Sequence, residues 1–327
     1  MIDKVLLGHG SGGALMADLL KNVVFAAFPD VQPTDGALAD VPAGMRLVFT
    51  TDSFVVKPLF FPGGDIGRLA VNGTVNDLAM MGAEPALISC GLIIEEGFAL
   101  DDLRWICASM SRAAMEAGAR IVTGDTKVVG HGEADSIFIN TSGIGYAQPV
   151  YGFSPDRVKA GDVIIVNGGL GEHGIAVMAG RLGVSFAPEL PSDSSPLWPQ
   201  VKALLGAGIV PGVMRDITRG GLGSVAAELA AGLPLDYHLR EACLPVDARV
   251  AKACDIWGFD PLYVASEGRF LLSVGPAQVE ETLRLLGPAA ASIGEVSAGT
   301  GRVFLHTTVG GVRPVRPLPG EMLPRIC

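Results

Sequence analysis

The sequence predicts an α+β fold of two domains followed by an extended tail. Its 327 residues can supply two hydrophobic cores. From residue 46 to residue 147, strand-like apolar runs alternate with long helical patterns, which is typical of a mixed sheet with helices on one side. Closely spaced prolines exclude a helix near the end. We therefore divide the chain into residues 1–152, residues 153–310 and a flexible tail of residues 311–327.

The composition indicates a globular, cytoplasmic protein. Apolar residues make up 49% of the chain, charged residues 18%, and the mean hydropathy is +0.42. No apolar run approaches the roughly 20 residues that a membrane helix needs, and the first residues lack the basic end and cleavage site of a signal peptide. The net charge of -10 and the pI ≈ 5.0 argue against nucleic acid, which favours a basic surface.

The five cysteines indicate neither a disulfide framework nor a zinc site, because their number is odd and no pair has CxxC spacing. We expect Cys107 in the core and only Cys327 to be exposed. Cys327 ends the arm that contains Pro314, Pro317, Pro319 and Pro324. An extended arm of this length reaches about 40–50 Å, so its thiol could carry a group to a distant site. The alternative is a frayed end.

Two glycine-rich stretches match the GxGxxG pattern of dinucleotide-binding proteins. Residues 8–13 are GHGSGG and residues 169–174 are GLGEHG, each before a predicted helix. Neither is followed by a hydrophobic strand that ends in an acid, which argues against NAD. The first stretch still offers amides to a phosphate, together with His9, Ser11 and Gly12, and a flexible N-terminus is the alternative.

Two acids of the N-terminal domain lie in apolar surroundings. Asp52 lies near the end of a predicted buried strand at residues 46–54, and Asp77 lies inside a predicted apolar helix at residues 66–82. Burying an acid costs stability unless something binds it. Both acids are therefore candidate ligands.

A third acid, Asp125, follows Gly124 where we expect a break in the strand at residues 120–129, and Lys127 lies two residues on. The other predicted elements of this domain are a strand at residues 86–96, a helix at 100–118 and a strand at 135–147. In the C-terminal domain, a short strand delivers Asp216, Thr218 and Arg219 to the start of a helix at a double glycine.

These side chains suit a magnesium–nucleotide site. The four acids are Asp52, Asp77, Asp125 and Asp216. If they converge, they fit Mg²⁺, which prefers a couple of carboxylates plus substrate oxygens, although each acid alone also fits a cap or turn. Lys127 could neutralise phosphoryl charge or be a surface lysine. Glu267, which precedes a predicted strand, could be a general base or a hairpin-turn residue.

Several motifs together resemble one known family. They are HGSGG, TTDSF, PLFFPGG, GTVNDLA, IVTGDTKVV, RDITRGGLG, SEGRF and the terminal PRIC. The chain is similar over essentially its whole length to the HypE family of hydrogenase-maturation proteins, a branch of the aminoimidazole-ribonucleotide synthetase (PurM-like) superfamily. PRIC and GDTKVV are specific to this branch, whereas RDITRGG is shared with selenophosphate synthetases and thiamine-phosphate kinases. Asn72 is a minor departure from the family's GTVNDLA surroundings.

The resemblance implies a two-domain PurM-like fold and a homodimer whose N-terminal sheets form a barrel with nucleotide sites around it. It also implies an activity: ATP-dependent dehydration of a carbamoyl group on the terminal thiol to a thiocyanate. A HypF-type carbamoyltransferase would load the thiol, and a HypC–HypD complex carrying iron would receive the cyanide.

The resemblance further implies roles for the candidate residues, with ATP and Mg²⁺ bound among them. The metal and phosphates would be held by Asp52, Asp77, Asp125 and Asp216; the carboxamide and its protons by Lys127 and Glu267; the phosphates by a mobile loop with His9, Ser11 and Gly12; and the nucleotide also by Asn76, Thr123 and Thr218. Three alternatives remain: a kinase or synthetase acting on a free small molecule, a non-catalytic thiol carrier, and an NAD-dependent dehydrogenase.

Overall fold

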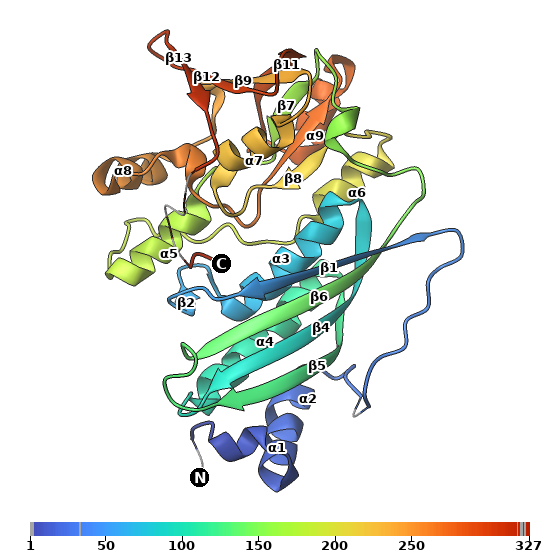
Figure 1. Ribbon diagram of the computed structural model, residues 1–327, viewed down its shortest axis with the longest axis vertical. Helices are drawn as coiled ribbons and strands as arrows, with labels where there is room; N and C mark the ends of the chain where they lie inside the picture. Colours follow the sequence, from blue (N-terminus) through green and yellow to red (C-terminus); the bar gives the residue numbers. More distant parts are fainter. Residues whose placement is uncertain (1–2, 33, 319, 321–322, 324) are drawn as a thin grey trace.

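The structure is a computed structural model that describes residues 3–32, 34–318, 320, 323 and 325–327. Its described residues form a four-stranded sheet in the N-terminal half and a seven-stranded sheet in the C-terminal half. The two sheets lie at opposite ends of an elongated molecule, and helix α3, Ile66–Met80, reaches from one toward the other (Figure 1). This arrangement confirms the predicted two-domain α+β fold.

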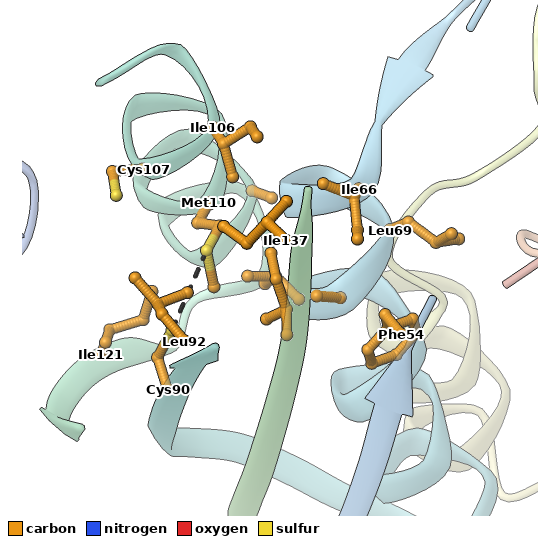
Figure 2. Packing of buried hydrophobic residues seen from close by; sticks show 14 of the residues in the cluster. Phe54, Ile66, Leu69, Cys90, Leu92, Ile106, Cys107, Met110, Ile121 and Ile137 are labelled. Atoms are coloured by element: carbon orange, nitrogen blue, oxygen red, sulfur yellow. Dashed lines mark hydrogen bonds between the residues drawn. The ribbon is translucent and has the colours of Figure 1, made fainter. Parts of the chain in front are cut away.

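The N-terminal sheet has the strand order β1-β6-β4-β5. Its strands are β1 (Arg46–Phe54), β4 (Ala83–Glu95), β5 (Arg120–Val129) and β6 (Ile137–Ala147). Strands β4 and β5 are parallel, and the other neighbours are antiparallel. Helices α3 and α4, Leu100–Ala117, cover one face, where Leu92, Met110 and Ile137 pack in a shared core (Figure 2). Cys107 is buried in this core as predicted, and burial raises the pKa of its thiol to about 12.

The opposite face of this sheet corrects two expectations. Strand β1 is not buried on both sides, because its alternate side chains point away from α3, with Phe49 62% exposed. Strand β5 is not broken at Gly124 and Asp125, since it pairs with β4 along its length with one register shift. The N-terminal segment packs beside β5 through η1 (Leu7–Gly10), α1 (Gly13–Leu19), η2 (Leu20–Val24) and α2 (Phe25–Ala27).

The C-terminal sheet has the strand order β13-β12-β9-β11-β7-β10-β8. Its strands are β7 (Val163–Val166), β8 (Met214–Asp216), β9 (Leu235–Arg240), β10 (Phe270–Val274), β11 (Ala291–Ala298), β12 (Val303–His306) and β13 (Val312–Val315). Its helices are α5 (Glu172–Leu182), α6 (Trp198–Gly206), α7 (Gly221–Ala230), α8 (Ala248–Trp257) and α9 (Val279–Leu286). Short 3-10 turns and the small β2–β3 hairpin, Phe60–Asp65, complete the described elements.

The C-terminal segment is more ordered than we expect from its prolines. Pro314 lies within β13, an edge strand, where the missing amide is tolerated. Residues 325–327 then return to the middle of the molecule, close to the β2–β3 hairpin and α5 (Figure 1). Pro319 and Pro324 lie outside the described residues.

In the part of the chain that the structure describes, no helix combines the length and apolar character needed to cross a bilayer.

Candidate active site

A cleft of 590 Å³ lies between the two domains. Strand β1 and helix α3 form one wall, and β8 with the loop that follows it forms another. The charged and reactive side chains that line this cleft are Asp52, Asp77, Arg215, Asp216, Arg219, Glu267 and Cys327. Three of the four predicted acids, the predicted base and the terminal thiol are therefore brought together.

Strand and helix periodicity place the first two acids. Asp52 lies on the face of β1 that looks toward α3, and Asp77 lies near the end of α3. The Thr50 hydroxyl donates to Asp77 Oδ2 at 2.7 Å. One turn before Asp77, Gly73 leaves room, because a Cβ there would lie 2.8 Å from the Phe54 ring and 3.6 Å from Asp52 Oδ2. The carboxyl group of Asp77, although it lies in an apolar helix, therefore faces the cleft.

Strand pairing places the other two carboxyl groups. Asp216 ends β8 and is the register partner of Phe270 in β10, and Glu267 lies three residues before Phe270. The backbone amide of Glu267 donates to the Asp193 carboxylate at 2.9 Å. The sequence gives no signal for Asp193, which comes from a segment with the pattern of a plain loop.

The carboxyl groups of the cleft crowd one another. Burial, then the charges of Asp77 and Asp52, raises the pKa of Asp216 to about 7. Burial, then the charges of Asp216, Asp193 and Asp52, raises the pKa of Glu267 well above its ordinary value. Burial likewise raises the pKa of Asp52 and of Asp77. Such a set gains stability when a cation enters it.

Two arginines bring the opposite charge to the same cleft. Arg215 Nε lies 3.8 Å from Asp216 Oδ1, and Arg219 lowers the pKa of both Asp52 and Glu267 through its charge. Both flank the predicted Asp216 and Thr218, and Thr218 also lines the cleft. Guanidinium groups bind phosphate oxygens well, so this wall can hold a polyphosphate.

The donor chemistry of the cleft fits Mg²⁺ that arrives with a nucleotide. Across the described ranges, no group of three or more His, Cys, Asp or Glu side chains is arranged to hold an ion alone. Mg²⁺ commonly uses one or two carboxylates and completes its shell with phosphate oxygens and water. In addition, Glu267 Oε1 is buried without a hydrogen-bond partner among the described residues. The described residues of the cleft therefore leave carboxyl oxygens that a bound ligand can contact.

Asn76, which we predict to contact the nucleotide, is not among the residues that line the cleft. Its side chain is 1% exposed, and its amide nitrogen donates to the carbonyls of Ser195 and Glu267, each at 3.0 Å. Its amide oxygen accepts from the Leu197 amide at 2.8 Å. Asn76 therefore joins the two domains and positions the Glu267 turn.

Within one chain, Asp125 does not join the other acids. Strands β1 and β5 are opposite edges of the sheet, and register with β4 places Thr123, Asp125 and Lys127 on the face away from α3. Lys127 Nζ lies 2.9 Å from Asp125 Oδ2, and this hydrogen bond lowers the pKa of Asp125. The expected convergence of four acids is wrong for a single chain, because sequence spacing does not reveal strand order.

The N-terminal glycine loop lies beside this second group. Gly10 packs so closely on β5 that a Cβ there would lie 2.8 Å from the Val128 amide nitrogen. His9 is buried, and its Nδ1 accepts from the Leu6 amide at 2.8 Å, so the ring braces its own loop. Ser11 and Gly12 are exposed. The predicted residues thus form two groups, one in the interdomain cleft and one along β5.

The thiol groups also differ from expectation, since both Cys243 and Cys327 are partly exposed. The tail is docked, with the Val55 amide donating to the main-chain oxygen of Cys327 at 3.2 Å. Ile326 is 2% exposed and belongs to the N-terminal core.

The sequence matches the AIR synthase related proteins, with their N-terminal domain at residues 33–147 and their C-terminal domain at residues 159–306. A relative from Bradyrhizobium diazoefficiens, named carbamoyl dehydratase HypE, is 46% identical over 98% of this chain and 95% of its own. The Escherichia coli K12 protein of the same name is 41% identical over 100% of both chains.

Solved structures agree with this relationship. A crystal structure of hydrogenase maturation protein HypE in complex with ATP has a TM-score of 0.94 and 42% identity, covering 98% of this chain and 99% of that chain. A crystal structure of a HypE–HypF complex has a TM-score of 0.80 and 39% identity, covering 94% of this chain and 100% of that chain. The chain therefore belongs to the AIR synthase related proteins and, among them, to the HypE family of carbamoyl dehydratases.

Proposed function

We propose that the protein is an ATP-dependent carbamoyl dehydratase that converts an S-carbamoyl group on Cys327 into a thiocyanate. The product supplies a cyanide ligand for the nickel–iron hydrogenase active site. The observation that carries this proposal is the shared cleft: Cys327 lines the same 590 Å³ space as Asp52, Asp216 and Glu267. An enzyme that acts on its own tail needs no separate pocket for a free amide, and the tether raises the effective concentration of the reacting group.

Two steps account for the loss of water. The carbamoyl oxygen attacks the γ-phosphate of ATP, and ADP leaves. The nitrogen then loses its protons as the phosphorylated oxygen departs with its bonding electrons as phosphate, which leaves S–C≡N on Cys327. Phosphorylation comes first because hydroxide is a poor leaving group and phosphate is a good one. A closed cleft protects the phosphorylated carbamoyl group from hydrolysis.

The cleft residues divide this work. Arg215 and Arg219 neutralise phosphate charge as it develops. Glu267 accepts a nitrogen proton, because its carboxyl group lines the same cleft as Cys327. Asp52, Asp77 and Asp216 would hold Mg²⁺, which when bound neutralises the phosphates and orients them for attack.

A homodimer would complete the site. The uncovered face of the N-terminal sheet exposes Leu47, Phe49 and Ile93, at 48%, 62% and 43%, and apolar side chains on a sheet face favour burial against a second copy. Pairing two such faces would bring Asp125, Lys127 and the glycine loop of one chain toward the cleft of the other. We therefore assign Asp125 and Lys127 to the partner chain's site.

Mixing two inactive variants tests this assignment. Lys127→Ala and Cys327→Ala should each be inactive alone, whereas exchange into mixed dimers should restore roughly a quarter of wild-type dehydration, because half of the dimers then hold one intact site of two. Mixing Lys127→Ala with a chain that carries both changes should restore nothing. Mixed dimers that form, as judged by mass-tagged chains, but stay inactive would contradict the shared site.

The proposed function also implies partner proteins, and we add the domain boundaries. We propose that a HypF-type carbamoyltransferase loads Cys327, that a HypC–HypD complex takes the cyanide, and that these steps occur in the cytoplasm. We also propose the domain limits 1–152 and 153–310, with residues 311–327 as the tail.

Intact-protein mass spectrometry tests the function directly. Wild-type protein that has been carbamoylated by the transferase should lose the mass of one water when Mg²⁺ and ATP are added, and the loss should map to the peptide that contains Cys327. A carbamoyl mass that persists with ATP present would reject the proposal.

A further inference from the structure

We propose that helix α5 holds the tail in the cleft by binding its main chain, and so sets the fraction of time that Cys327 spends beside the carboxylates. Two side chains of this helix make the contacts, His173 at its start and Arg181 near its end. They are positioning residues for the dehydration. The link to catalysis rests on the proposed function, whereas the docking itself does not.

His173 binds the tail from a buried position. Its Nε2 lies 2.9 Å from the carbonyl oxygen of Ile326, and its Nδ1 lies 2.8 Å from the Ser192 hydroxyl. Because a carbonyl only accepts, Nε2 carries the proton, and the hydroxyl donates to Nδ1. The Phe61 ring meets the imidazole edge-on at 5.5 Å between centroids. These neighbours fix the imidazole, and burial lowers its pKa to about 4, so the donor stays neutral near pH 7.

Arg181 ties the tail to the other domain. Its Nη2 donates to the carbonyl of Arg325 at 2.9 Å and to the carbonyl of Lys57 at 2.7 Å, and its Nε donates to the same Lys57 oxygen at 3.0 Å. One half-buried guanidinium group therefore links a segment of the N-terminal domain, helix α5 and the tail.

The N-terminal domain contributes contacts that resemble strand pairing. The amides of Val55 and Lys57 donate to the main-chain oxygens of Cys327 and Arg325, each at 3.2 Å. Arg325 Nε donates back to the Val55 carbonyl at 2.9 Å, and its guanidinium group pairs with Asp135.

The pattern of these contacts suits a chain that must dock and leave. The main-chain oxygens of residues 325, 326 and 327 all accept hydrogen bonds, and main-chain contacts do not depend on what the side chain carries. The docked tail can thus hold the thiol in place whether or not it carries a group. Loading by another enzyme requires the undocked tail, so weakening the contacts of α5 should slow dehydration without slowing carbamoylation.

Carboxypeptidase digestion of the full chain, followed by intact mass, measures the undocked fraction, because an exopeptidase cuts only the released tail. Arg181→Ala removes a charged donor and should speed loss of the terminal residues about tenfold or more. Arg240→Ala, an exposed arginine that pairs with Glu295 far along the sequence from the tail, is the matched control and should leave the rate unchanged. Thermal unfolding of both variants confirms that each is folded.

A second pair of variants tests the donor at position 173. His173→Gln keeps a side-chain N–H and should stay near the wild-type digestion rate, whereas His173→Leu should follow Arg181→Ala. In preloaded protein, Arg181→Ala should slow dehydration, because the docked fraction of the tail falls, while the transferase loads the variant at least as fast as the wild type. Equal digestion rates for Arg181→Ala and the wild type would overturn the proposal that helix α5 holds the tail in the cleft. Failure of the wild type to dehydrate its tail would instead reject the proposed function, because digestion needs neither ATP nor a partner.

Discussion

Replacing Cys327 with alanine is expected to abolish formation of the thiocyanate completely. In the proposed mechanism the carbamoyl group is built on this thiol, and no other described residue that lines the cleft offers a thiol. ATP and Mg²⁺ should still bind, because the carboxylates and arginines are unchanged. Intact mass after incubation with the transferase and ATP measures product, and calorimetric titration with ATP measures binding.

The matched control is Cys243→Ala. Cys243 is also partly exposed but lies in a 3-10 turn of the C-terminal domain, outside the residues that line the cleft. This variant should form thiocyanate at the wild-type rate. If Cys327→Ala still consumed ATP at the full rate with a free carbamoyl compound, the protein would be a small-molecule kinase or synthetase of the same superfamily.

Replacing Asp216 with asparagine should lower the rate of dehydration by about a hundredfold or more while making the folded protein more stable. In the proposed mechanism this carboxylate helps to hold Mg²⁺ and the phosphates. Without Mg²⁺ and phosphates, the ionised Asp216 destabilises the folded protein, since burial and the charges of Asp77 and Asp52 raise its pKa from 3.8 to about 7. Relieving that strain should increase the free energy of unfolding by roughly 1–2 kcal/mol near pH 8, less than the full cost because the contact with Arg215 is lost.

The pH dependence gives this prediction its sign. Between pH 3.8 and about 7, Asp216 is protonated in the folded chain and ionised in the unfolded chain. Wild-type stability should therefore fall as the pH rises through this window, and the Asp216→Asn variant should lack that component. The stability difference should vanish near pH 4.

Urea unfolding without nucleotide or Mg²⁺, from pH 4 to pH 8, measures both curves. A substitution at Asn167 serves as the control, because this residue is buried and does not line the cleft. It should give no increase in the free energy of unfolding, since the Asn167 amide already has hydrogen-bond partners. A variant that is less stable than the wild type at pH 8 would show that Asp216 is not under electrostatic strain.

The sequence by itself determined most of the secondary-structure elements and the candidate residues of the cleft. Apolar periodicity located β1, α3 and α4, and the acids at strand ends and in an apolar helix marked Asp52, Asp77 and Asp216 as candidate ligands. The prolines correctly excluded a helix from residues 311–318. These features depend on neighbours within a few residues, and so local spacing reports them.

Only the tertiary structure decided which residues meet. Strand order places Asp125 on the far edge of the sheet from Asp52, and the packing of the two domains makes Asn76 a contact between them. It also brings His173 and Arg181 to a tail more than 140 residues away in sequence. Such contacts depend on how sheets and domains pack, and local sequence spacing contains no information about the order of strands or the path of a returning chain.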